Sequence, residues 1–219
     1  MMRLSRYDGS PNIGVYAVVN ESLAIVAPNT SQEFLKDLEV VLGVQTFMTT
    51  VSSSFLVGSL VSMNSNGAVV SSTAEASELE EIRKHIPIEV LPTDVNAAGN
   101  NVLVNDRGAV INPDLNKRSE KLIGDLLGVE VIKSTVAGCN IVGSMCSVTN
   151  KGCLCNVNTS DKEIEMLQDI FKVEVKKTSV NHGSKYIGTG ILCNSKGALI
   201  GDETTPIEMG KIEDGLMLY

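Results

Sequence analysis

Two histidines and five cysteines are the side chains of this 219-residue chain with the most versatile chemistry. His182 precedes Cys193 by eleven residues, and a thiolate beside an imidazole is the arrangement that cysteine-dependent hydrolases use. Binding of a cationic substrate would also require carboxylates, and Asp94 is the only carboxylate close to the small polar loops at residues 52–54, 96–100, 137–140 and 181–184. Cys193 lies in the apolar run Ile191-Leu-Cys193, just before a turn, so a packing role is favoured over catalysis.

The remaining cysteines raise the possibility of a metal site. Cys153-x-Cys155 puts two thiols on one face of a strand, and Cys139 and Cys146 are nearby. Zinc-binding cysteine pairs usually lie in loops, whereas these cysteines occupy strand positions. We therefore expect thiols of the core, and we expect neither a metal nor another cofactor.

The charge of the chain limits the kinds of partner that it can bind. The formal net charge is −8, and the basic residues are scattered along the chain. A protein that grips a phosphate backbone over a broad surface needs clustered Lys and Arg. No stretch approaches the roughly 18 apolar residues of a membrane span, and the first residues lack the apolar core of a secretory signal. We expect a cytoplasmic protein that docks on basic proteins and not on a membrane.

A turn of the form Asn-x-x-Gly recurs along the chain, each time between two apolar segments. Asn and Gly tolerate positive φ, which a tight hairpin requires. The glycines of successive turns are 41, 44 and 45 residues apart, and a degenerate first copy lies one period earlier. The five turns are Asn20-Glu-Ser-Leu23, Asn64-Ser-Asn-Gly67, Asn105-Asp-Arg-Gly108, Thr149-Asn-Lys-Gly152 and Asn194-Ser-Lys-Gly197.

A helix and a short strand follow each turn. Apolar residues at helical spacing, such as Leu79, Ile82 and Ile86, predict helices with one buried face. The predicted helix starts carry side-chain oxygens that can accept from free N–H groups; they are Asn29-Thr30, Thr73, Pro113-Asp114, Thr159 and Thr204-Thr205.

The repeated unit is therefore strand, turn, strand, helix, strand, in one α/β domain over residues 1–219. Such units share a core and cannot stand alone. No capping unit is visible, so we predict a closed ring in which Met1–Tyr7 completes the last unit. The predicted repeats span residues 12–51, 55–95, 98–136, 139–180 and 186–219.

Small polar loops join the units, and in a ring with repeat symmetry they emerge on one face. They are poor in charge and rich in Asn, Ser and Gly, and loops on a rigid scaffold often carry function. Simple chain reversal is the alternative role for any one of them. The candidate binding residues in these loops are Asn12, Ser53, Ser54, Asn96, Gly99, Asn100, Gly138, Asn140, Asn181, His182 and Gly183.

Segments along the whole chain resemble the archaeal branch of the translation initiation factor 6 family. The order and spacing of these segments carry the resemblance; they include Asn12-Ile-Gly-Val-Tyr-Ala17, Asn96-Ala-Ala-Gly-Asn-Asn101, Leu127-Gly-Val-Glu-Val131 and Thr178-Ser-Val-Asn-His-Gly-Ser184. The resemblance implies the pentein fold, a five-fold pseudosymmetric ring.

The resemblance also implies a monomeric factor that binds the large ribosomal subunit and prevents its association with the small subunit. The implied partners are ribosomal protein uL14, a uL24-family protein and the sarcin–ricin loop. Gly14, Ser59 and Asn100 align with family positions associated with ribosome contact. Ser59 and His182 stand where the eukaryotic branch has Arg, which puts a charged contact at these positions in doubt.

Two other functions stay open at this point. One is a pentein-fold guanidino-group hydrolase or amidinotransferase that uses Cys193 and His182. The other is a scaffold for a different basic protein.

Overall fold

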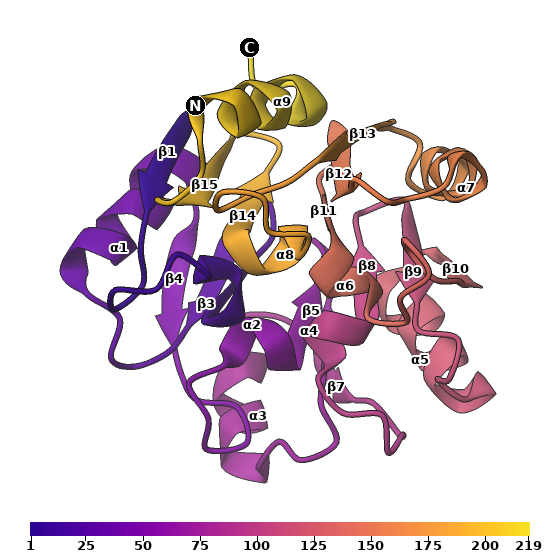
Figure 1. The fold of residues 1–219 in the computed structure, drawn as a ribbon. Coiled ribbons are helices and arrows are strands. Elements are labelled where there is room, and N and C mark those ends of the chain that lie inside the picture. Colours follow the sequence, from indigo (N-terminus) through magenta and orange to yellow (C-terminus); the bar gives the residue numbers. More distant parts are fainter.

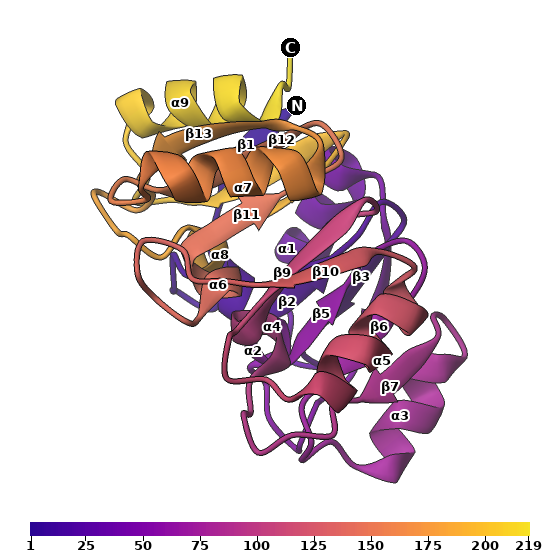
Figure 2. The ribbon, with the colours of Figure 1, turned by 90° about the vertical axis from the view of Figure 1, so that its right-hand side faces the viewer.

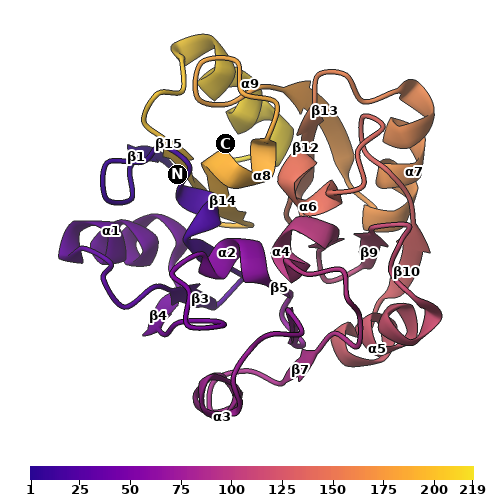
Figure 3. The same cartoon turned by 60° about the horizontal axis from the view of Figure 1, so that its bottom comes forward.

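Hairpins closed by the recurring turns are the repeated element of the computed structural model, which describes residues 1–219 (Figure 1). Each hairpin gains a third strand that runs parallel to its second strand, and the result is five three-stranded sheets. The first strands of the hairpins contact one another in turn around an axis, and the last of them contacts the first. The five sheets therefore form the closed pentein ring that the sequence predicts (Figure 3).

The strands of each unit are short, and the helix of each unit lies on the outside of the ring. The hairpins pair β2 (Ala17–Val19) with β3 (Leu23–Val26), β5 (Val61–Met63) with β6 (Ala68–Val70), β8 (Val102–Val104) with β9 (Gly108–Ile111), β11 (Cys146–Val148) with β12 (Gly152–Asn156), and β14 (Ile191–Asn194) with β15 (Gly197–Gly201). The outer helices are α1 (Gln32–Asp37), continued by η2 (Leu38–Leu42), α3 (Ala76–Arg83), α5 (Lys117–Leu127), α7 (Asp161–Phe171) and α9 (Pro206–Leu216). The outer strands are β4 (Gln45–Met48), β7 (Ile88–Val90), β10 (Glu130–Lys133) and β13 (Glu174–Thr178).

The first residues of the chain supply the outer strand of the fifth unit, as predicted. Strand β1 (Met2–Ser5) runs parallel to β15, with Met2 opposite Ala198. Arg3 and Ser5 on this strand donate hydrogen bonds to Asp37 on α1, whose side chain is buried. The ring is thus closed without a covalent link.

Each unit begins with a short helix that the predicted unit lacked. These inner helices are η1 (Ile13–Val15), α2 (Val57–Leu60), α4 (Ala98–Asn101), α6 (Val142–Met145) and α8 (Ile187–Gly190). They lie around the axis (Figure 3), and Figure 2 shows α2, α4, α6 and α8 along one side of the molecule. We call this side the inner-helix face.

The second residue of every inner helix is a glycine, and the five glycines form a closed cycle. A Cβ atom on any one of them would overlap the carbonyl oxygen of its neighbour in the cycle. Any larger residue therefore forces the backbones apart. The members of this glycine cycle are Gly14, Gly58, Gly99, Gly143 and Gly188.

The recurring turns are linked to one another at the opposite end of the axis. The side-chain Nδ2 of Asn20 donates to the carbonyl oxygen of Asn64 at 2.8 Å, and Asn64 donates to Asn105 at 3.2 Å. Asn105 donates to Thr149 at 3.1 Å, and Asn194 donates to Asn20 at 3.1 Å. Thr149 has no amide to donate, so this asparagine relay contains four of five possible links.

Four of the five outer helices begin later than predicted. Their N-cap residues are Ser31, Glu75, Asn116 and Ser160, and only Thr205 was anticipated. The hydroxyl of Thr30 donates instead to the carbonyl of Ala27, at 2.6 Å, and tightens the turn before the helix. None of the helices is long and apolar enough to cross a bilayer.

The missing link of the relay gives a stability prediction. Thr149→Asn keeps an oxygen for its own turn and adds an amide aimed at the carbonyl of Asn194. We expect the free energy of unfolding to rise by about 1 kcal/mol, measured by urea denaturation. The reciprocal change Asn105→Thr removes hydrogen bonds to Thr149 and Phe171 and should lower it by about 1–3 kcal/mol. Equal stability of both variants and the unmodified protein would contradict the relay's role.

Candidate functional site

Tight turns precede four of the five inner helices and shape the inner-helix face. Each is closed by a bridge between two residues, namely Tyr7 and Ser10, Val51 and Ser54, Val136 and Cys139, or Val180 and Ser184. Their central residues have positive φ, among them Ser52, Ser53, Ala137, Asn181 and His182. This conformation costs energy for residues other than glycine, so it needs support from the surrounding structure.

Three glutamates supply that support, of which Glu78 and Glu208 are buried and Glu163 is half-buried. Glu208 on α9 accepts hydrogen bonds from the backbone N–H groups of His182 (3.2 Å) and Gly183 (2.8 Å). Glu78 on α3 accepts in the same way from Ser52 and Ser53, at 2.7 and 2.9 Å. We call these contacts glutamate clamps.

The third clamp is formed by Glu163 on α7, which accepts from the N–H of Gly138 at 3.2 Å. Each clamp glutamate is the third residue of its helix, and its Oε2 also accepts from the N–H of the N-cap residue in a capping box. The sequence prediction that Asp94 is the only carboxylate near these loops is therefore wrong. These carboxylates are saturated by protein donors, so they are not free to hold a guanidinium.

The hydrogen bonds keep the clamp carboxylates ionised. Burial opposes the charge of Glu208, but donation from Ser179, Thr205 and Gly183 outweighs it and lowers the pKa of the carboxyl to about 2. The pKa values of Glu78 and Glu163 are lowered too, again against burial, by the donors of their clamps and capping boxes. The turns are therefore held by charge-assisted hydrogen bonds, which are stronger than neutral ones.

The two remaining loops are built differently. The helices α1 and α5 have Phe34 and Ser119 at the clamp position. The loop before η1 has a bridge but no clamp, and the loop before α4 has no bridge. The amide of Asn116 holds that loop from outside by donating to the carbonyl of Pro92 at 2.7 Å.

The structure brings the predicted site residues to the inner-helix face. Gly14 and Gly99 belong to the glycine cycle, while Ser59 and Asn100 are the third residues of their inner helices. The turns and loops carry the rest, namely Asn12, Ser53, Ser54, Asn96, Gly138, Asn140, Asn181, His182 and Gly183.

Several of the predicted polar side chains are engaged within the protein. Asn140 donates to Asp114 at 2.8 Å, Asn181 donates to the carbonyl of Pro11 at 2.9 Å, and Asn100 accepts from Ser144 at 3.1 Å. These amides help to shape the face; Asn140 is exposed on it, and Asn100 and Asn181 are half-buried. Their contact with a partner stays a prediction.

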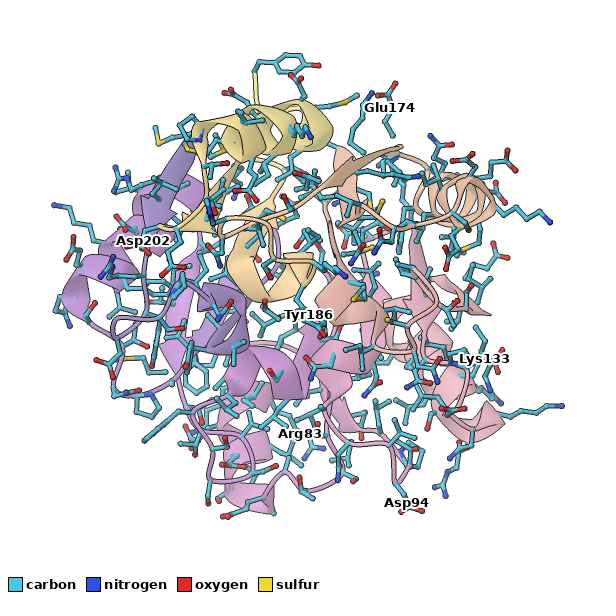
Figure 4. The ribbon with its side chains drawn as sticks, in the orientation of Figure 1. Arg83, Asp94, Lys133, Glu174, Tyr186 and Asp202 are labelled. Atoms are coloured by element: carbon cyan, nitrogen blue, oxygen red, sulfur yellow. The ribbon has the colours of Figure 1, made fainter.

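Exposed apolar residues on this face were not predicted. Leu56, Ile141 and Tyr186 are the residues directly before α2, α6 and α8, and they are 44%, 36% and 50% exposed. Figure 4 shows Tyr186 over the middle of the molecule, while Asp94, Lys133, Glu174 and Asp202 are labelled farther from its centre. An alignment of the five units on the glycines of the glycine cycle would have placed Leu56, Ile141 and Tyr186 at equivalent positions, two residues before the glycine.

The geometry gives the hydrolase alternative no support. Cys193 lies opposite Ala198 near one end of β15, whereas Asn181, next to His182, packs against Gly201 at the other end. Three strand residues separate these ends by about 10 Å, which is beyond hydrogen-bond reach. Burial also raises the pKa of the Cys193 thiol to about 12, so the nucleophilic thiolate is disfavoured.

The other candidate for chemistry, the cysteine pair of β12, lies in the core. Cys153 and Cys155 are fully buried together with Cys146 against α7 residues such as Phe171. Burial raises the pKa of Cys155 to about 11 and that of Cys146 well above its usual value. These thiols therefore behave as small apolar side chains.

A small cavity lies on the axis of the ring. Its volume is about 120 Å³, and the glycine cycle, Ser62, Ser147 and Cys193 are among the groups that line it. A second space of about 30 Å³ lies beside the asparagine relay. Side chains thus leave the centre of the ring partly hollow, on the scale of a few water molecules.

The clamps predict a specific pH dependence of stability. A folded-state pKa below the ordinary value of about 4.3 stabilises the fold above that pH, and the stabilisation is lost as pH falls toward 2. In Glu208→Gln, we expect the free energy of unfolding to fall less steeply between pH 4 and 2 than in the unmodified protein. Glu213→Gln, at an exposed position of the same helix, is the control and should keep the original slope; an unchanged slope in Glu208→Gln would contradict the clamp.

Comparison with known proteins agrees with the fold. A sequence model of the eIF-6 family matches residues 2–215. The chain is 44% identical to translation initiation factor 6 of Archaeoglobus fulgidus over 209 residues, which cover 95% of this chain and 97% of the relative. It is 39% identical to translation initiation factor 6 of Thermoplasma acidophilum over 216 residues, 99% of this chain and 100% of the relative. The resemblance found in the sequence is confirmed: the chain belongs to the eIF-6 family.

Proposed function

We propose that this protein is a translation factor that binds the large (50S) ribosomal subunit through the inner-helix face and prevents association with the small subunit. The observation that carries the proposal is family membership over nearly the whole chain. The proposed mechanism is steric: a rigid ring occupies the surface that the small subunit would contact, so the effect depends on the lifetime of the complex.

The composition of the inner-helix face supports docking on a protein surface. The predicted site residues on this face are mostly uncharged, and the chain has a net charge of −8. A surface of this kind suits a basic ribosomal protein better than RNA phosphates. We propose uL14 as the main partner, with contacts to a uL24-family protein and the sarcin–ricin loop, and a cytoplasmic monomer as the active form.

Binding to purified large subunits tests the proposal. We expect the protein to pellet with the subunits at moderate salt, and to reduce the formation of complete ribosomes when small subunits are added. Light scattering and sucrose-gradient sedimentation measure the two effects. Failure to pellet with the subunits would contradict the proposal.

A variant at the axial cavity separates this function from the hydrolase alternative. Because Cys193 lines the cavity and not the docking loops, Cys193→Ala should bind large subunits as the unmodified protein does. Formation of citrulline from a guanidino substrate, lost in Cys193→Ala, would instead favour the enzyme.

A further inference from the structure

The inner-helix face does not have five-fold symmetry in its chemistry. At the residue before each inner helix, three units carry a large apolar side chain, namely Leu56, Ile141 and Tyr186. The equivalent residues of the other two units are Asn12 and Ala97. The large apolar residues therefore belong to the second, fourth and fifth units.

The glutamate clamps occur in the same three units. Glu78 holds the turn before Leu56, Glu163 holds the turn before Ile141, and Glu208 holds the turn before Tyr186. The two units without a clamp are those without a large apolar residue. Two features of the ring thus coincide, namely a carboxylate that holds the turn and an exposed apolar residue that follows the turn.

A chain of hydrogen bonds connects clamp and apolar residue in the fifth unit. Glu208 fixes the N–H groups of His182 and Gly183, and the turn is closed by N–H donation from Ser184 to Val180 at 2.7 Å. The hydroxyl of Ser184 then accepts from the N–H of Tyr186 at 3.4 Å.

The second unit repeats this chain. Glu78 fixes the N–H groups of Ser52 and Ser53, and the hydroxyl of Ser54 accepts from the N–H of Leu56 at 3.2 Å. In these two units the backbone that presents the apolar residue is therefore fixed before any partner arrives, whereas the fourth unit has Cys139 in place of the serine.

Stability does not explain exposed apolar residues at these positions. The residue before a helix is best filled by Ser, Thr, Asp or Asn, and none of the three apolar residues makes a capping hydrogen bond. A few buried side chains, tyrosine more often than leucine, supply most of the binding energy of protein interfaces, and a side chain that is already held rigidly loses little conformational entropy when it is buried.

We propose that Leu56, Ile141 and Tyr186 form an apolar tripod that anchors the partner, and that Glu78, Glu163 and Glu208 are positioning residues for it. The proposal rests on the proposed function and names the surface by which it is carried out. The partner that binds the tripod is a protein of the large subunit that has exposed apolar side chains within a basic surface. Apolar side chains do not bind phosphate, which argues against RNA. The net charge of this chain is −8, which favours a basic partner.

Serine substitutions test the tripod. We expect Leu56→Ser, Ile141→Ser and Tyr186→Ser each to weaken binding to purified large subunits by about tenfold, and the triple variant to weaken it at least a hundredfold. The melting temperature should not fall, since serine suits the position. Ile207→Ser, at a 77% exposed apolar residue on α9, is the matched control and should bind normally.

The outcomes separate this proposal from the function on which it rests. If the unmodified protein does not bind subunits, the proposed function fails. If it binds and the triple variant binds equally well, the tripod is wrong while the function stands. If the triple variant binds normally and its affinity for the subunits falls steeply as the salt concentration is raised, the contact would be assigned to RNA.

A double-mutant cycle tests the positioning role. Glu208→Gln should speed amide hydrogen exchange at His182 and Gly183 in the free protein and weaken subunit binding several-fold. In the background of Tyr186→Ser, the same change should have little further effect on binding. Additive losses, or unchanged exchange at the turn, would overturn the role of Glu208.

Discussion

Direct contact between backbones at the axis is the constraint on which the rest of the ring depends. The five inner helices meet so closely that only hydrogen fits at Gly14, Gly58, Gly99, Gly143 and Gly188. This approach sets the radius of the ring and leaves a hollow of only about 120 Å³ between the hairpins. At the opposite end the asparagine relay holds the turns through side-chain amides that donate to backbone carbonyls, so neither end of the axis depends on bulky apolar side chains.

A rigid axis allows the periphery of the ring to vary from unit to unit. The outer helices differ in their caps, and only α3, α7 and α9 have a glutamate that reaches the neighbouring turn. The same scaffold thus holds three turns by glutamate clamps, whereas the other two loops have no clamp and are held by other contacts. A docking face with unequal sectors can specify one orientation on its partner, which a fully symmetric ring could not do.

Much of the architecture could be predicted because turn chemistry is local. The Asn-x-x-Gly turns indicated the repeat, and the apolar spacing indicated helices such as α5 and α7. The inner helices were missed because four residues with a central glycine show no helical periodicity and have poor helix propensity. The recurrence of Gly14, Gly58 and Gly99 at the period of the turns, 44 and 41 residues apart, held the missing information.

The parts of the candidate site that were missed depend on contacts between distant residues. Glu78 lies 25 residues after Ser53 in the chain, and nothing in its local sequence distinguishes it from the other acidic residues of α3. The exposure of Leu56 or Ile141 likewise follows from the ring, since an isolated apolar residue before a helix is normally buried.

The pairing of β1 with β15 has a consequence for the way in which the chain reaches its native state. Met2 and Ala198 are neighbours in space but are separated by most of the chain. During synthesis the amino-terminal strand emerges first, yet its partner emerges only after four units have been made. Until then β1 has no strand to pair with, and the growing chain is an open arc. Completion of the ring is therefore the final and most non-local step of assembly, the kind of closure that is slow to form.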